Sequence, residues 1–301
     1  MIRVRVPATS ANLGPGFDCM GLALDLWNTF DLELSGPPGE LTIDVQGEGA
    51  DSLPTDRSNC VYQTLVQALE QERYELRHGV CIRCDNEVPC ISGLGSSSTA
   101  IVAGLAFAHA LSRGAVNLES LLNEAVAIEG HGDNVGPAIM GGLMLIMPYN
   151  GGAIVRSVPF VPITVTVCVP DFVFLTTEAR ACLPESVPRT DAVFNLGRAM
   201  FVLQALRDGD DELLQKAMAD RIHEQYRLPR IPGAVQAMDA AKKAGALAVC
   251  LSGAGPGIIA FASEKHNGIG HAMIRAFEDA GLRARHWVLT TTAQGTCVSI
   301  G

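Results

Sequence analysis

The segment VPCISGLGSSSTAIVAG, residues 88–104, constrains the fold more than any other part of the sequence. Gly93 and Gly95 bracket one leucine, three serines follow, and helix-forming or apolar residues continue from Thr99 to Leu111. This pattern predicts a glycine-rich turn that leads into a long buried helix, whose first backbone N–H groups have no partner within the helix. Such N–H groups, together with the positive end of the helix dipole, form an anion site.

A simpler interpretation of this segment is a helix-capping serine behind a flexible turn. One cap needs one hydroxyl, however, and the segment offers three in a row, at Ser96, Ser97 and Ser98. It is not a Walker A loop either, because no lysine precedes the hydroxyls as that motif requires. We therefore interpret it as a phosphate-binding turn of another kind.

Composition narrows the class of protein. The chain has 301 residues, 48% of them hydrophobic and 18% charged, which predicts a well-buried globular protein of two domains or one large one. Its formal net charge is −10 without a run of basic residues, so we expect no nucleic-acid partner and no anionic membrane partner. The start, MIRVRVPATS, lacks the apolar core of a signal peptide, and the apolar runs are shorter than a membrane span. We expect a cytoplasmic protein.

The nine cysteines are scattered and odd in number, which favours buried free thiols over disulfides. Cys81 and Cys84 form a C-x-x-C pair within a predicted strand. A zinc ribbon needs a second such pair, and a redox pair normally opens a helix. We interpret this pair as structural.

Alternating apolar and polar residues predict strands at the start of the chain, beginning with Ile2–Val6. The segments TFDLELS and LTIDVQG read as two further strands, paired around the turn Gly36–Gly39. Helical spacing follows in residues 58–74 and 118–130, and GGLMLIMP reads as a buried strand. Turn residues in YNGGA then place a domain boundary, giving domains 1–152 and 153–301.

The second half shows a mixed order of elements. Strands are predicted for PITVTVCVP, ALAVCLSGAGPGIIAFA and, as the last one, ARHWVLTTT, with several helices between them. Long strands and helices interleave without a strict strand–helix–strand rhythm. This favours an α+β fold over a doubly wound parallel sheet.

Three glycine-rich segments occur in a fixed order: PATSANLGPGFDCMG from Pro7, the serine-rich turn, and LSGAGPGIIA from Leu251. In this order they resemble the signature motifs of the GHMP kinase superfamily. At closer range the chain is similar to the homoserine kinases, in EGHGDNVGPAIMGG from Glu129, TTEARACLP from Thr176 and DRIHEQYRLPRIPG from Asp220. The likeness spans essentially the whole chain.

The resemblance implies a two-domain fold, with an N-terminal nucleotide-binding domain, a ferredoxin-like C-terminal domain and the active site between them. It implies transfer of the γ-phosphoryl group of ATP, with Mg²⁺, to the side-chain hydroxyl of L-homoserine, giving O-phospho-L-homoserine for threonine biosynthesis. It also implies a homodimer. The chemistry needs positioning and charge neutralisation more than covalent help.

The resemblance assigns one group of residues to the nucleotide: Asn59, Gly93, Leu94, Gly95, Ser96, Ser97 and Ser98. Glu129 would bind Mg²⁺ together with the hydroxyl of Ser97, or of Ser98 one place on, since oxygen ligands suit this ion. The alternative for Glu129 is a solvated residue at a helix end, and for Asn59 a helix N-cap.

A second group is assigned to the substrate: Asn12, Asp18, His131, Asn134, Thr176, Arg180, Arg227 and Gly253. Homoserine is a zwitterion, so Asp18 suits its ammonium group, and Arg180 and Arg227 suit its carboxylate. We expect Asn134, Glu129 and Arg180 to act in catalysis. Each residue also has a structural alternative, such as a turn for Asp18 or the surface for either arginine.

We expect no general base at Asn134, and the side chain of the adjacent Asp133 is expected to point elsewhere. Related kinases carry an aspartate where this chain has Asn134, and an amide does not accept a proton usefully, so we expect direct in-line attack. The third segment, SGAGPG, lacks hydroxyls at Ala254 and Gly257. We expect it to act through the backbone amides of Gly253 and Gly255, which would support the phosphate-binding turn or the substrate. Other interpretations are a GHMP kinase with a different alcohol acceptor, such as mevalonate, and a non-catalytic nucleotide-binding protein on this fold.

Overall fold

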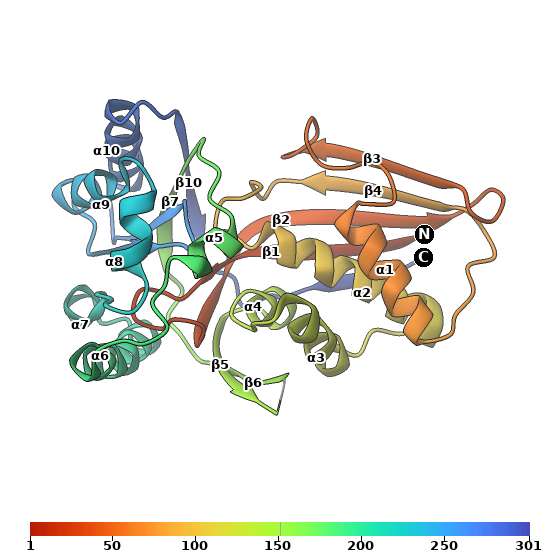
Figure 1. Ribbon diagram of the computed structural model, residues 1–301, viewed down its shortest axis with the longest axis horizontal. Coiled ribbons are helices and arrows are strands. Elements are labelled where there is room, and N and C mark those ends of the chain that lie inside the picture. The colour runs from red at the N-terminus through yellow and green to blue at the C-terminus, as the bar shows by residue number, and fades with distance from the viewer. Residues whose placement is uncertain (151) are drawn as a thin grey trace.

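The computed structural model describes residues 1–150 and 152–301, whose strands form two sheets in two lobes (Figure 1). The larger sheet has the order β11–β1–β2–β4–β3, and β5 and β6 continue it from β2. Its strands are β1 (Ile2–Ala11), β2 (Met20–Leu34), β3 (Leu41–Gly47), β4 (Val80–Asn86), β5 (Leu143–Tyr149), β6 (Gly152–Val158) and β11 (Cys297–Ile300).

Helices α1–α4 lie along one side of this sheet (Figure 1). They are α1 (Cys60–Gln71), α2 (Ser96–Arg113), α3 (Leu118–Glu129) and α4 (Val135–Met140), so the predicted helices in the first half are confirmed. The helix α2 is buried almost all round, because its alanine-rich run from Ile101 to Ala110 packs between α1, α3 and β1.

The predicted pairing of TFDLELS with LTIDVQG is wrong. Strand β4 lies between them, antiparallel to β2 and parallel to β3, and α1 makes the crossover that a parallel pair needs. Alternation shows which side chains are buried, and it does not show which strands are neighbours. The side chains of Val80, Ile82 and Cys84 are buried, so β4 takes the protected position inside the sheet and leaves β3 at the edge.

The second sheet has the order β10–β7–β9–β8 and belongs to the other lobe. Its strands are β7 (Thr164–Pro170), β8 (Ala248–Leu251), β9 (Ile258–Phe261) and β10 (Ala284–Thr290). The helices of this lobe are α5 (Thr176–Ala181), α6 (Arg189–Asp208), α7 (Asp211–Ala217), α8 (Glu224–Arg227), α9 (Ala234–Lys243) and α10 (His266–Asp279), with the 3₁₀ turn Leu228–Arg230 after α8. Within the described residues, no helix has both the length and the apolar character needed to cross a bilayer.

Two features of this half differ from the sequence-based expectation. The segment ALAVCLSGAGPGIIAFA forms the antiparallel pair β8 and β9 and not one strand, because its glycine-rich centre turns the chain back. After β10, the strand β11 returns to the larger sheet and pairs with β1. The change of sheet occurs between Val158 and Thr164, and the division into domains 1–152 and 153–301 remains a prediction.

The three glycine-rich segments meet between the lobes. The N–H of Gly253 donates to the carbonyl of Ala11 (3.1 Å), and the hydroxyl of Ser252 donates to the carbonyl of Gly93 (2.7 Å). A Cβ added at Gly93 would lie 2.1 Å from the carbonyl oxygen of Ser252, so only glycine permits this approach. The fold therefore brings the three segments to one place.

Beneath this junction lies a buried carboxyl group on α8. Glu224 is buried, and its Oε1 accepts the N–H of Leu251 at 2.7 Å. Burial raises the pKa of Glu224 from 4.5 to about 7, although the Leu251 N–H opposes the shift. Relative to an unfolded chain with the ordinary pKa, the protonated group favours folding at low pH, and this contribution is lost as pH rises through 7.

We predict that Glu224→Gln removes this pH dependence. The variant should match the wild type near pH 5 and exceed its free energy of unfolding by about 1–3 kcal/mol at pH 8, because glutamine stays neutral. Urea unfolding at both pH values measures the difference. The exposed Glu212→Gln is the matched control and should leave the profile unchanged. Parallel profiles for Glu224→Gln and the wild type would contradict the prediction.

Candidate active site

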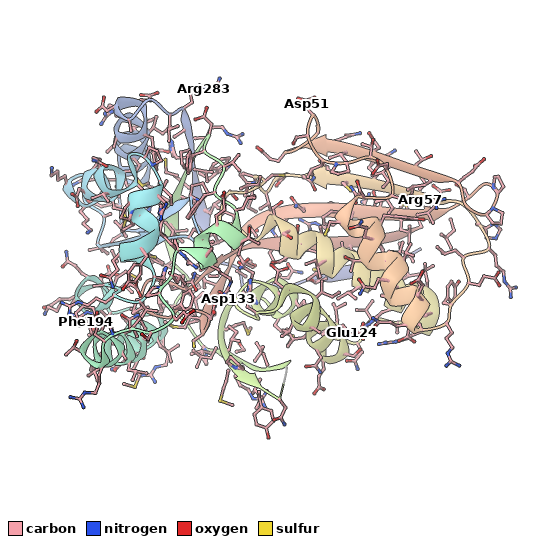
Figure 2. All side chains as sticks on the ribbon, in the orientation of Figure 1. Asp51, Arg57, Glu124, Asp133, Phe194 and Arg283 are labelled. Carbon is pink, nitrogen blue, oxygen red and sulfur yellow. The ribbon has the colours of Figure 1, made fainter. Side chains whose placement is uncertain are left out.

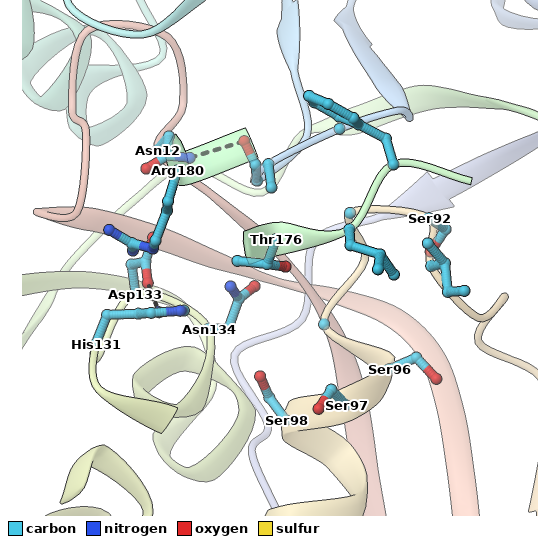
Figure 3. Close-up of a pocket in the computed structure, with 18 of the residues that line it drawn as sticks. Asn12, Ser92, Ser96, Ser97, Ser98, His131, Asp133, Asn134, Thr176 and Arg180 are labelled. Carbon is cyan, nitrogen blue, oxygen red and sulfur yellow. Dashed lines mark hydrogen bonds and ion pairs between the residues drawn. The ribbon is translucent and has the colours of Figure 1, made fainter. Parts of the chain in front are cut away.

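A cavity of about 230 Å³ opens at the junction of the three glycine-rich segments (Figure 3). Most of the predicted site residues line it: Asn12, Asp18, Gly93, Gly95, Ser96, Ser97, Ser98, Glu129, His131, Asn134, Thr176, Arg180, Arg227 and Gly253. Two do not. Leu94 is buried below the cavity, and Asn59 lines a neighbouring one.

The serine-rich turn ends in a helix start, as expected. Gly95 takes a left-handed conformation (φ 72°) and α2 begins at Ser96. Within the described residues, the structure gives no hydrogen-bond partner to the backbone N–H groups of Ser96, Ser97 and Ser98. Their hydroxyl groups lie at the same end of α2 (Figure 3). This end of α2 can hold an anion.

A second cavity, of about 240 Å³, adjoins the first and shares Ile91, Ser96 and Ser97 with it. Its wall is largely apolar, with Phe30, Val61, Cys84 and Ala100 among its residues, beside the amides of Asn28, Asn59 and Asn86. Asn59 is the N-cap of α1: its Oδ1 accepts the N–H of Val61 (3.0 Å) and its Nδ2 donates to Pro54 O (2.8 Å). The position next to the anion site suits the base of a nucleotide.

Glu129, the last residue of α3, faces the start of α2. The hydroxyl of Ser98, which is buried, donates to Glu129 Oε1 at 3.1 Å, whereas Ser97 is exposed. Burial raises the pKa of Glu129, against the opposing effects of the His131 charge and the Ser98 hydrogen bond. Within the described residues Glu129 has no ion-pair partner, and no three His, Cys, Asp or Glu side chains are grouped to hold a metal ion.

Asp18 and Arg180 form a two-pronged ion pair across the two lobes. Arg180 NH2 lies 2.8 Å from Asp18 Oδ1, and Arg180 NH1 lies 3.1 Å from Asp18 Oδ2. The hydrogen bond to Asp18 raises the pKa of Arg180. Asn12 supports this pair, because its Oδ1 accepts the N–H of Asp18 (2.9 Å) and its Nδ2 donates to Gly253 O (2.8 Å). The amide of Asn12 is thus used within the protein.

Arg227 is 2% exposed, and within the described residues no carboxylate is close enough to pair with it. Its Nε donates to Ala179 O (3.1 Å), and its NH1 lies 3.2 Å from His223 Nδ1 and 3.5 Å from Gly253 O. Burial and the nearby Arg180 lower the pKa of Arg227. A buried guanidinium without a counter-ion, at the wall of a cavity, is suited to bind an anion.

His131 and Asp133 also line the cavity, and His131 Nδ1 lies 2.6 Å from Asp133 Oδ1. Burial lowers the pKa of His131, but the hydrogen bond and the charge of Asp133 outweigh it, so the pKa is raised overall. Asp133 was expected to point elsewhere, but it is among the residues that line the cavity, where it is buried near the centre of the molecule (Figure 2). Asn134 Oδ1 accepts the hydroxyl of Thr9 (2.9 Å), and Thr176 begins α5 at the rim of the cavity.

The third glycine-rich segment supports the serine-rich turn, which is one of the two roles expected for it, but not through the expected amides. The amides of Gly253 and Gly255 are not free for a ligand, because they donate to Ala11 O and Ser252 O. The segment instead supports the serine-rich turn, through the hydroxyl of Ser252 and through the N–H of Gly257, which donates to Ser92 O (3.2 Å).

Sequence reasoning missed several residues that shape the site, namely Thr9, Phe17, Ser252 and His223. All lie inside the quoted segments, but their residue types gave no sign of a role. A left-handed backbone at the non-glycine residues Asn12, Leu13, Asp18 and Ile91 was also not apparent. Backbone strain of this kind is typical of functional sites.

Comparisons with known proteins agree with this geometry. Residues 59–142 match the family of GHMP kinases N terminal domains, and residues 202–279 match the GHMP kinases C terminal family. The homoserine kinase of Desulfitobacterium hafniense is 37% identical over 99% of this chain and 100% of its own length. The homoserine kinase of Trichodesmium erythraeum is 39% identical over 99% and 98%.

Solved structures lead to the same family. The crystal structure of homoserine kinase from Cytophaga hutchinsonii superposes with a TM-score of 0.85 and 31% identity, covering 99% of this chain and 97% of that one. Leishmania major mevalonate kinase, solved with R-mevalonate, shares the fold at a TM-score of 0.74 and 17% identity, covering 97% and 96%. With its fold, its site and these full-length relatives in agreement, the chain belongs to the homoserine kinases, within the GHMP kinases.

Proposed function

We propose that this protein transfers the γ-phosphoryl group of ATP to the side-chain hydroxyl of L-homoserine, giving O-phospho-L-homoserine for threonine biosynthesis. The observation that carries this proposal is the buried, unpaired guanidinium of Arg227, which shares one cavity with the Asp18–Arg180 pair and the N-terminus of α2. An amino acid brings one carboxylate and one ammonium group to such a set of charges. Mevalonate has no ammonium group for Asp18.

The substrate would bind by its two charged groups. Arg227, with Arg180 beside it, would bind the carboxylate, and Asp18 would bind the ammonium group on its other side. His131 and Thr176 would stand near the side chain of the substrate, since both line the same cavity. The hydroxyl would then face the N–H groups at the start of α2, where the triphosphate of ATP would bind.

The transfer itself is an in-line displacement. The hydroxyl oxygen of the substrate attacks the γ-phosphorus of ATP, the bond from that phosphorus to the β-phosphate oxygen breaks, and ADP leaves. The hydroxyl proton passes to a phosphate oxygen or to solvent. Asn134 and Arg180 would orient the reacting groups, and the side chain of Asp133 is paired with His131.

Glu129 and the hydroxyl groups at the start of α2 fit a magnesium ion. The half-buried carboxylate of Glu129, which has no ion-pair partner among the residues that the structure describes, and the adjacent hydroxyl of Ser98 are hard oxygen donors, which this ion prefers. The ion would neutralise phosphate charge when bound. Ser97 is the alternative hydroxyl ligand. The homodimer and the cytoplasmic location expected from the sequence remain predictions.

The acceptor is tested by measuring ADP release with MgATP and L-homoserine, mevalonate, L-threonine or no acceptor. We expect turnover with L-homoserine alone. Equal or faster turnover with mevalonate would contradict the proposed amino-acid site, although the protein would still be a kinase. Binding of MgATP without turnover on any acceptor would favour a non-catalytic nucleotide-binding protein.

Arg227→Gln should raise the KM for L-homoserine about 100-fold, because a buried charge-assisted contact to the carboxylate is lost. The dissociation constant for MgATP should stay within a factor of about two of the wild-type value, as the guanidinium is assigned to the acceptor. Steady-state kinetics and calorimetry measure the two quantities. Arg230→Gln is the matched control, because Arg230 is exposed three residues further on. An unchanged KM in Arg227→Gln would refute the assignment.

The two serines can be separated by binding of Mn²⁺ in the presence of ADP, followed by electron paramagnetic resonance. Ser98→Ala should weaken Mn²⁺ binding roughly tenfold, equivalent to about 1.4 kcal/mol, and Ser97→Ala should change it less. The reverse order would make Ser97 the ligand. Glu129→Gln should weaken binding more than either, and Ser112→Ala, near the other end of α2, serves as the control.

A further inference from the structure

We propose that His223, held as a neutral imidazole, is a positioning residue that sets the orientation of the Arg227 guanidinium for the substrate carboxylate. This inference rests on the proposed role of Arg227. His223 is the N-cap residue of α8, one helical turn before Arg227, and its side chain is fully buried. It does not line the cavity, so it reaches the substrate only through Arg227.

The two contacts of the ring fix its proton. His223 Nε2 lies 2.9 Å from the carbonyl oxygen of Gly14, which only accepts hydrogen bonds, so Nε2 carries the hydrogen. His223 Nδ1 lies 3.2 Å from Arg227 NH1, which only donates, so Nδ1 offers its lone pair. One state satisfies both contacts, the neutral ring with hydrogen on Nε2. Burial also lowers the pKa of His223, although the charge of Asp220 opposes this shift, and a lowered pKa favours the same neutral ring.

The ring is held on every side. The carboxylate of Asp220 accepts the backbone N–H groups of Ile222 (3.0 Å), His223 (2.8 Å) and Glu224 (2.8 Å), which fixes the start of α8. The ring of Phe17 stacks on that of His223, with centroids 5.2 Å apart and planes 29° apart. The hydrogen bond from Nε2 ties His223 to the first glycine-rich segment.

Arg227 depends on this arrangement. Its Nε is held by Ala179 O, its NH1 by His223 and more weakly by Gly253 O, and its Cζ lies 5.2 Å from the centre of the Phe17 ring. Of the two contacts that hold NH1, the one to His223 Nδ1 is the shorter, and the other is to a backbone carbonyl. Without a hydrogen-bond acceptor at the place of Nδ1, the planar guanidinium can tilt about the Cγ–Cδ and Cδ–Nε bonds, and the fork offered to a carboxylate loses its fixed orientation.

Two substitutions of His223 each keep one of its two ring hydrogen bonds and remove the other. In His223→Asn the amide oxygen can stand at the place of Nδ1 and still accept from Arg227. In His223→Gln the amide nitrogen can reach the place of Nε2 and donate to Gly14, but no acceptor remains at Nδ1. We expect His223→Gln to raise the KM for L-homoserine roughly tenfold to hundredfold, with kcat changed less than threefold, and His223→Asn to restore most of the loss.

A carboxylate-free acceptor separates positioning from a general structural defect. For 3-aminopropan-1-ol, which is L-homoserine without its carboxylate, kcat/KM should be the same in His223→Gln and the wild type. The double variant His223→Gln/Arg227→Gln should be no worse with L-homoserine than Arg227→Gln alone, because the two residues act on one contact. Equal losses with both acceptors, or additive losses in the double variant, would overturn the proposal.

A control variant and the two single variants together distinguish failure of the positioning role from failure of the carboxylate site. His109→Gln is the matched control: His109 is fully buried and paired with Glu124, roughly 20 Å along α2 from Ser96 (Figure 2 labels Glu124). It should lower the unfolding temperature without changing the KM. If Arg227→Gln raises the KM and His223→Gln does not, the positioning role is wrong and the proposed function stands. If Arg227→Gln leaves the KM unchanged, the carboxylate site itself is wrong.

Discussion

The structure depends on one steric constraint: three backbone segments from distant parts of the chain meet more closely than side chains would allow. At Gly93 a methyl group would collide with Ser252 O, at Gly257 with Ser92 O, and at Gly95 with the hydroxyl of Thr9. This junction joins the two lobes, and it also sets the direction of α2. The unpaired N–H groups at the start of α2 therefore face the residues of the other lobe that carry charge.

Ligand binding in this protein also depends on local charge, because its net charge is −10. An anionic phosphate cannot be attracted by the overall field, so its binding depends on local N–H groups and arginines. Arg180 has a carboxylate partner in Asp18, whereas the hydrogen bonds of Arg227 within the described residues are to carbonyl oxygens and an imidazole and not to a carboxylate. The guanidinium of Arg227 therefore favours binding of an anionic ligand. The charge of Arg180 is balanced by Asp18, so Arg180 does not repel the ammonium group of the same ligand.

The sequence predicted the elements that depend on local patterns. The glycines and serines before α2 and the helical spacing of α1 and α3 were apparent without the fold. The resemblance to a known family supplied most of the predicted residues that line the cavity, although Leu94 and Asn59 do not line it. Strand neighbours were not apparent from the sequence, because alternation in β2 and β3 contains nothing about β4. The support that the third segment gives to the serine-rich turn was among the expectations, but the groups that give it were not predicted. The N–H of Gly253 donates to Ala11 O, far away in sequence, and the N–H of Gly255 donates to Ser252 O within the same turn. His223 was not predicted either, because a buried histidine has no pattern of its own.

The pairing of β11 with β1 affects the order in which the parts of the protein can fold during synthesis. Strand β11 pairs with β1, so the sheet that supports the nucleotide site contains both the earliest and the latest residues of the chain. During synthesis, residues 2–158 can collapse around α2, but the outer edge of β1 stays open until residues 297–300 have left the ribosome. The other lobe must therefore be made, and can fold, before the first is closed. The second lobe is in this sense an insertion within the first, and neither can be cut out as one uninterrupted stretch of chain.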